Sequence, residues 1–232
     1  MENELKYSVQ ANFKAELDEI IEQQKDILAA NYLAPLSTEY LPWSSSAMRP
    51  SGLVNTLNEI IIDNRGVILE CGGGISTFYI ARLLKSKGGH LYTLEHNREW
   101  LELLHRGLTK EKLLDWVTLI DAPLKSSGLG LDDMPWYDPD AIAQQFPQDI
   151  KIDLLLVDGP PAYTQETQYS RYPAVSYFLP FFSQNCTIVI DDINRQGEQE
   201  IVKRWQKNID VNFEIKDGNI AIAKINQELK GL

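Results

Sequence analysis

A glycine-rich turn follows the first segment that has the pattern of a buried strand. Gly72-Gly73-Gly74 lies between Glu70-Cys71 and Ile75-Ser76-Thr77, and the residues after it have the pattern of a helix. Glycines at a strand-to-helix turn let the backbone approach a ligand closely. The turn therefore indicates a ligand site, although glycine also forms tight turns that bind nothing.

Carboxylates end the next two predicted strands. Glu95 ends the second strand, 25 residues after Glu70. An acidic residue at about this offset typically accepts hydrogen bonds from ribose hydroxyls. Asp121-Ala122 ends the third strand, where it could meet an adenine edge. These positions predict a nucleoside-containing ligand, and the alternative for Glu95 is a solvated carboxylate or a cap for the following helix.

A second group of carboxylates follows the fourth and fifth predicted strands. Asp158-Gly159-Pro160-Pro161 ends the fourth, and Asp191-Asp192 ends the fifth. Three carboxylates at one sheet edge repel one another unless they are protonated or bound to a cation, and their oxygens suit Mg²⁺. Asp191 and Asp192 can share one ion only if the strand has already ended, because adjacent strand residues point to opposite faces. The alternative is that Asp192 or Asn194 caps the next helix.

Apolar runs that alternate with helical patterns must position these residues. Continuous apolar strands separated by helices are typical of a parallel sheet covered on both faces. Two final runs, 211–216 and 219–225, are separated only by Asp217-Gly218, which is a strong hairpin signal. We therefore predict an α/β, Rossmann-like, seven-stranded, mostly parallel sheet with a C-terminal antiparallel hairpin and helices on both faces. The other five runs are 67–69, 91–94, 117–120, 152–157 and 187–190.

The N-terminal part has a different pattern. Apolar residues at helical spacing predict helices over about 13–30 and 52–63. We therefore expect one domain that consists of a helical cap, 1–63, and an α/β core, 64–232. The segment 122–149 contains glycine, proline, Trp136 and Tyr137. A loop of this length in a compact domain is usually functional or disordered.

Composition narrows the choice of partners. The 232 residues are 44% hydrophobic and 24% charged, which is ordinary globular usage. The net charge of −11 disfavours nucleic acid as a partner. No apolar run is long enough to span a membrane, and the N-terminus does not resemble a signal peptide. Cys71 and Cys186 lie in apolar runs and are expected to be buried thiols in a reducing, cytoplasmic compartment. Whether the protein forms a homo-oligomer stays open.

Two ligand classes share this layout. Dinucleotide sites prefer a third glycine where this chain has Thr77. That departure, together with Glu70 before the glycines and the terminal hairpin, favours the other class. From about 60 to 225 the chain resembles the class I S-adenosylmethionine-dependent methyltransferases, whose fold is a seven-stranded sheet with an antiparallel last strand.

The resemblance implies roles for the residues at the first three strand ends. Gly72, Gly74 and Ser76 would surround the amino-acid part of S-adenosylmethionine, and Glu70 would face its ammonium group or an ordered water. Glu95 would hold both ribose hydroxyls, with His96 near the ribose or adenine. Asp121-Ala122 would bind the adenine.

The second acidic group is similar to the metal-binding pattern of macrocin-type and catechol-type O-methyltransferases. This resemblance implies Asp158, Asp191 and Asp192 as Mg²⁺ ligands and a small-molecule acceptor that is methylated at a hydroxyl. The macrocin-type family has an acidic residue where this chain has Pro160, so its proposed base is missing and metal use stays open. Without a metal, Asp158 is the best candidate for the base.

The acceptor is expected to contact aromatic residues and one cation. The sequence offers Trp43, Arg171 and Tyr172, and Arg171 is the most obvious anchor for an acidic or hydroxylated acceptor. Ordinary packing of aromatic side chains under loops is the alternative. Two other functions compete with the methyltransferase: a nucleotide- or NAD-binding oxidoreductase, and a non-catalytic module that binds S-adenosylmethionine.

Overall fold

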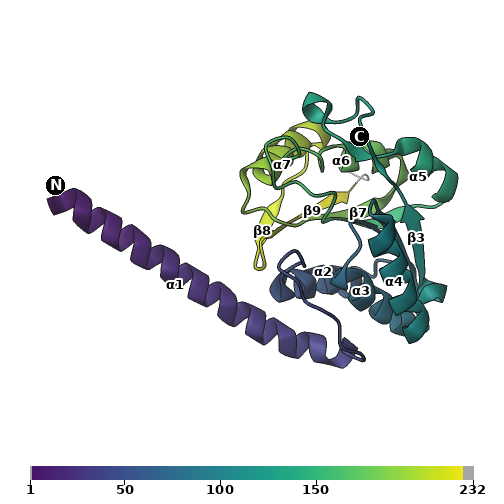
Figure 1. Ribbon diagram of the computed structural model, residues 1–232, viewed down its shortest axis with the longest axis horizontal. Helices are drawn as coiled ribbons and strands as arrows, with labels where there is room; N and C mark the ends of the chain where they lie inside the picture. The colour runs from purple at the N-terminus through teal and green to yellow at the C-terminus, as the bar shows by residue number, and fades with distance from the viewer. Residues whose placement is uncertain (1, 227–232) are drawn as a thin grey trace.

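A seven-stranded sheet forms the centre of the protein (Figure 1). The computed structural model describes residues 2–226, and the side chains of residues 2–12, 15 and 226 lie outside that description. The strands of the sheet are β1 (Val67–Cys71), β2 (His90–Glu95), β3 (Val117–Asp121), β6 (Ile152–Val157), β7 (Phe182–Ile190), β8 (Glu214–Lys216) and β9 (Ile220–Asn226). Their order is β3-β2-β1-β6-β7-β9-β8, with the first five parallel and β9 antiparallel to both neighbours. The predicted fold class is confirmed.

Helices cover both faces of this sheet. One face packs against α2 (Pro50–Ile62), α3 (Ile75–Lys87) and α4 (Arg98–Glu111). The other packs against α5 (Pro139–Gln145), α6 (Pro173–Phe178) and α7 (Gln196–Ile209). The central strands are apolar along their length because they are buried on both sides, as the fully buried run Leu154 to Val157 shows.

The C-terminal hairpin joins the helical N-terminal part to the sheet. Gly218 in its turn has φ +86°, and a Cβ at that position would lie 2.0 Å from the backbone nitrogen of Gly52 in α2. Asn55 donates a hydrogen bond to the Asp217 carbonyl, and Lys25 pairs with the Asp217 carboxylate at 2.6 Å. The hairpin prediction is confirmed, although β8 begins three residues later than expected.

The first helix, α1 (Glu2–Leu33), is longer than the predicted 13–30 and extends away from the rest of the protein (Figure 1). Among the side chains of α1 that the structure describes, those of its last turns contact the rest of the protein. Ala29 and Leu33 are buried, and Asp26 accepts hydrogen bonds from Arg49 and Ser51. The apolar side chains nearer the N-terminal end of the helix, such as Phe13, are exposed.

The segment 122–149 is more regular than the long loop that its composition predicts. It forms a small antiparallel sheet of β4 (Leu124–Lys125) and β5 (Trp136–Tyr137), followed by α5. Trp136 and Tyr137 are completely buried in the core on the α5 side of the main sheet. Their burial explains why this segment is ordered, and it brings Tyr137 under the carboxyl edge of the sheet.

Two further expectations concern burial and membranes. Both cysteines are free and fully buried, as predicted. Within residues 2–226 we find no helix with the length and hydropathy needed to cross a bilayer. The division into a cap and a core at residue 63 stays a prediction, although α2 and the sheet share one apolar cluster.

Candidate active site

The strand order reverses between β1 and β6, and a cavity of about 620 Å³ opens at the carboxyl ends of these strands. Ligands of open α/β sheets bind at this switch point. The cavity is lined by the glycine turn, by residues after β2, β6 and β7, and by part of the N-terminal segment. The lining residues that carry polar groups relevant to binding are Ser44, Ser45, Ser46, Gly73, Ser76, Glu95, His96, Asn97, Trp100, Tyr137, Asp158, Arg171, Asp192 and Arg195.

The turns after β1 and β6 pack backbone against backbone. Gly72 has φ +92°, and a Cβ there would lie 2.9 Å from the Asp158 carbonyl oxygen. A Cβ on Gly159 would in turn lie 2.8 Å from the Gly72 Cα. Glycine at both positions therefore allows the two turns to meet and leaves their polar groups facing one cavity.

Glu95 lies in that cavity and is 4% exposed. Its Oε2 accepts a hydrogen bond from the Gly73 backbone at 3.2 Å, and its Oε1 accepts one from the Asn97 backbone at 2.7 Å. Asn97, and not Glu95, provides the side-chain cap of α4 by accepting from the Trp100 backbone. A carboxylate has about four acceptor sites, so Glu95 can still accept from ligand hydroxyls.

Glu70 has a different environment from the one that the resemblance implies. Its side chain is completely buried, does not line the cavity, and accepts hydrogen bonds from the hydroxyls of Ser76, Thr77 and Thr93 at 2.5, 2.6 and 2.8 Å. Glu70 therefore anchors the start of α3 to β1 and β2, and its expected contact with the ligand or an ordered water stays a prediction. Ser76 reaches the cavity wall, but its hydroxyl is committed to Glu70.

Burial raises the pKa of Glu70 to about 7, although the hydrogen bonds from the three hydroxyl groups lower it. The unfolded chain releases this proton near its ordinary pKa of 4.5, so the folded state loses stability as pH rises from there to about 7. The loss amounts to about 3 kcal/mol above pH 7.

We expect Glu70→Gln to remove this pH dependence, because glutamine does not titrate. Urea unfolding at pH 5 and pH 8 measures it: the wild type should lose about 3 kcal/mol relative to the variant between the two pH values. A constant difference between the two proteins would show that Glu70 ionises normally.

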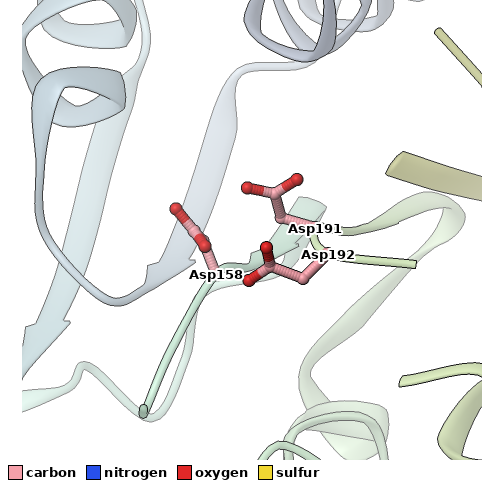
Figure 2. Close-up of side chains that lie close together, drawn as sticks. All are labelled: Asp158, Asp191 and Asp192. Carbon is pink, nitrogen blue, oxygen red and sulfur yellow. The ribbon is translucent and has the colours of Figure 1, made fainter. Parts of the chain in front are cut away.

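The three aspartates come together as predicted (Figure 2). Asp158 follows β6, and Asp191 and Asp192 follow the end of β7, so both residues of the pair lie beyond the strand. Each of the three offers one carboxylate oxygen, and these oxygens lie within 4.8 Å of one another. The capping alternative is wrong, since α7 begins after Arg195 and has no side-chain cap.

Arg171 lies beside this acidic cluster and is 3% exposed. Its guanidinium donates to three backbone carbonyls: Nε to Pro160, Nη1 to Asp191 and Nη2 to Asp158, at 3.2, 3.3 and 3.2 Å. It thereby ties the turn after β6 to the turn after β7.

The same guanidinium forms ion pairs with three carboxylates. Nη1 lies 3.0 Å from Asp192 and 3.5 Å from Glu198, and Nη2 lies 3.6 Å from Asp158. Three of its N–H groups therefore donate to backbone carbonyls, and its charge faces three carboxylates. Arg171 is therefore an internal counter-ion of the cluster, and the structure gives no support to its predicted role as an acceptor anchor.

The cluster holds more negative than positive charge when all groups are ionised. Four carboxylates (Asp158, Asp191, Asp192 and Glu198) face the guanidiniums of Arg171 and Arg195. Burial and the neighbouring aspartates raise the pKa of Asp158 well above its usual range and that of Asp191 to about 7. The excess charge can be balanced by protons or by a cation.

Other predicted site residues lie outside the cavity lining. Trp43 packs near Tyr79, with ring centroids 6.1 Å apart, and the Tyr172 hydroxyl accepts from Asn208. The predicted contacts of Trp43 and Tyr172 with an acceptor are therefore not supported. Asp121 and Ala122 end β3 beside Glu95 without lining the cavity, so their adenine contacts stay a prediction.

Sequence reasoning missed Trp100 and Arg195 as site residues. Trp100 donates from Nε1 to the Gly73 carbonyl at 2.7 Å, and Arg195 pairs with Asp192 at 2.8 Å. Trp100 comes five residues after Glu95, and Arg195 comes three residues after Asp192. That proximity in sequence to Glu95 and to Asp192 was the only available signal.

A comparison with known proteins identifies the family of this chain. Residues 69–193, more than half of the chain, match the family model of a methyltransferase domain. The chain therefore belongs to the methyltransferase domain family. The resemblance to class I methyltransferases is confirmed, and the oxidoreductase alternative is not supported.

Solved methyltransferases share the fold at low sequence identity. The O-methyltransferase TomG of Streptomyces achromogenes, in complex with SAM, is 16% identical with a TM-score of 0.54, over 87% of this chain and 89% of that chain. The Bacillus cereus O-methyltransferase in complex with SAH is 19% identical with a TM-score of 0.52, over 86% and 90%. The SAH-bound Podospora anserina methyltransferase PaMTH1 is 13% identical with a TM-score of 0.56, over 86% and 94%. Curated protein sequences give no match.

Proposed function

We propose that this protein transfers the methyl group of S-adenosylmethionine to a hydroxyl of a small-molecule acceptor. The observation that carries the proposal is the placement of Glu95, the glycine turn and Asp158 around one cavity at the switch point of a methyltransferase-family domain. Structurally similar proteins that bind SAM or SAH include O-methyltransferases, which supports both the donor and the acceptor atom.

The residues of this cavity suit the two tasks of methyl transfer, alignment and proton removal. The methyl group of the cofactor is bonded to a sulfonium sulfur, which is a good leaving group. The protein therefore has to align the acceptor with this methyl group and accept the acceptor's proton. Glu95 would hold the ribose, and the glycine turn would lie beside the methionine tail. Asp158, which also lines the cavity, would accept the proton.

Glu95→Ala should weaken SAH binding by about tenfold or more, because a hydrogen bond to a charged group contributes about 1.5–3 kcal/mol. Isothermal titration calorimetry with SAH measures the change. Glu99→Ala, an exposed carboxylate in the first turn of α4, is the matched control and should bind as the wild type does. Equal affinity of the Glu95 variant would remove Glu95 from the site.

We also propose that one Mg²⁺ binds to Asp158, Asp191 and Asp192. The carboxylate oxygens suit a hard cation, their spacing allows a shared ion, and the cluster has an excess of negative charge beside Arg171 and Arg195. When bound, Mg²⁺ would supply a Lewis acid that lowers the pKa of an acceptor hydroxyl.

Titration of Mg²⁺ into the cofactor-free protein tests this proposal without any activity assay. The wild type should bind one ion and melt at a higher temperature in its presence, and Asp191→Asn should lose both effects. Asp149→Asn, at an exposed aspartate that precedes β6 while Asp158 follows it, should behave as the wild type. No binding at millimolar Mg²⁺ would contradict the metal site and leave the methyltransferase proposal intact.

The remaining expectations concern the cellular location and the partners of the protein. A cytoplasmic location, the lack of a nucleic-acid partner and a homo-oligomer stay predictions. The net charge of −11 supports a small-molecule acceptor over a nucleic acid.

A further inference from the structure

The helix α1 carries an apolar stripe that the described part of the chain leaves uncovered. Seven of its large apolar side chains are exposed, among them Phe13 at 68% and Tyr32 at 74%. At 3.6 residues per turn, all seven fall within about 140° of the helix circumference, and no acidic residue between Phe13 and Tyr32 falls among them. The stripe consists of Phe13, Leu17, Ile20, Ile21, Ile27, Leu28 and Tyr32.

The opposite side of α1 is already attached to its own domain. Ala29 and Leu33 are buried there, and Asp26 accepts hydrogen bonds from Arg49 and Ser51. These contacts turn the stripe away from the sheet and its helices, and α1 extends from the rest of the protein (Figure 1). The domain that holds α1 therefore does not cover the stripe among its described residues.

We propose that α1 is a dimerisation helix, and that two copies of this chain pair through their stripes. In water the stability of a helix comes mostly from the packing of its apolar face. A second copy presents the same face to α1 and covers it, and the contact is then the same on both copies, as in a two-fold symmetric dimer.

The spacing of the stripe is that of a paired helix. Intervals of four and three residues alternate along its middle, and this heptad spacing lets two helices insert side chains between those of the partner. Two of the positions are the polar residues Gln24 and Asn31, and a polar residue in such a seam specifies the register of the pair. The six positions are Phe13, Leu17, Ile20, Gln24, Ile27 and Asn31.

The exposed apolar area of the stripe is what a dimer needs. The seven side chains together expose on the order of 500 Å² in each copy, at the areas usual for apolar and aromatic side chains. Pairing of two copies would bury on the order of 1,000 Å², which is the area expected of a specific protein interface.

The charges of α1 favour a second copy over a lipid surface. Helices that lie on membranes carry Lys and Arg on their polar side, where these attract anionic lipids. Between Phe13 and Leu33, α1 has five acidic residues against two lysines. None of the five lies in the stripe, so pairing of two stripes buries no carboxylate.

The molar mass in solution tests the pairing. Size-exclusion chromatography with light scattering at micromolar protein should give twice the chain mass of 26.4 kDa. The double variant Leu17→Lys/Ile20→Lys should dimerise about 100-fold more weakly or worse and elute with the mass of one chain, because the seam loses apolar contacts and gains like charges. Both side chains are exposed in the single chain, so this variant should still unfold cooperatively.

The double variant Asp18→Lys/Glu19→Lys is the matched control. Asp18 and Glu19 are exposed in the same turns of α1 but lie outside the stripe. This variant gains the same two side chains and should stay a dimer. Should Leu17→Lys/Ile20→Lys not fold, Phe13→Lys, farther from the domain, should weaken the dimer in the same assay.

Two results would overturn the inference: a wild-type protein with the mass of one chain, or a dimer that persists unchanged in the folded stripe variants. A single-chain mass together with sedimentation on phosphatidylcholine vesicles would assign the stripe to a lipid surface and so overturn it too. The inference does not rest on the proposed methyl transfer, and a failure to bind SAH would leave it intact.

Discussion

Replacing Arg171 with methionine is expected to lower the free energy of unfolding by about 3–5 kcal/mol, the usual cost of removing one partner of a buried ion pair. Methionine keeps much of the apolar stem but leaves three backbone carbonyls without their donor and the carboxylates of Asp158, Asp192 and Glu198 without their shared cation. The loss should be larger at pH 8 than at pH 5, because the carboxyl groups can take up protons at the lower pH and so reduce their repulsion.

Urea unfolding at the two pH values measures this effect, and Arg204→Met is its control. Arg204 pairs with Glu200 on the exposed side of α7, where an ion pair contributes about 0–1 kcal/mol. If Arg171→Met does not fold, Arg171→Lys keeps the charge with fewer donors and should be intermediate in stability. Stability equal to the wild type in both Arg171 variants would show that the cluster does not need this cation.

The second large effect is expected at Asp158. Asp158→Asn should reduce kcat by about 100- to 10,000-fold, the range for loss of a general base. Proton acceptance and Mg²⁺ binding both require the ionised carboxylate, so the loss is expected whether or not metal is present. Binding of SAH should change little, because Glu95 and the glycine turn hold the cofactor.

The role of Asp158 as a base also predicts the direction in which kcat changes with pH. The base works only when it is deprotonated, so kcat of the wild type should rise with pH. Burial and Asp191 raise the pKa of Asp158, which places that rise above the ordinary carboxyl range. Mg²⁺ favours the ionised carboxylate and should move the rise to lower pH. A single-turnover methyl-transfer assay across pH, with Asp149→Asn as control, checks both; a profile that is unchanged in Asp158→Asn would exclude Asp158 as the base.

Much of the fold follows from local sequence pattern. Apolar runs such as 152–157 predict buried parallel strands because both faces of β6 are covered, and Asp217-Gly218 predicts the hairpin because its turn needs a positive φ. The extension of β7 back to Phe182 was not predictable in this way. Its residues Ser183 to Asn185 are polar and partly exposed, and the extra length comes from pairing with β6 and β9.

The site was predictable only where sequence position fixes spatial position. Strand ends in a parallel sheet meet at one edge, so the cluster of Asp158, Asp191 and Asp192 could be expected. The partners of Glu70 and Arg171 depend on long-range packing. Glu70 is buried and accepts hydrogen bonds from three hydroxyls of two other elements. Arg171 pairs with carboxylates and carbonyls that follow two different strands. A single sequence does not contain those distances.

The central claim is that an adenosine with a methionine tail binds across the carboxyl edge of this sheet. A crystal structure of the protein grown with SAH measures this directly. We expect density for the nucleoside in the cavity between β1 and β6, with the ribose hydroxyls on Glu95 and the tail beside Gly72 to Gly74. A nucleoside bound elsewhere on the protein, or no bound nucleoside at millimolar SAH, would contradict the account.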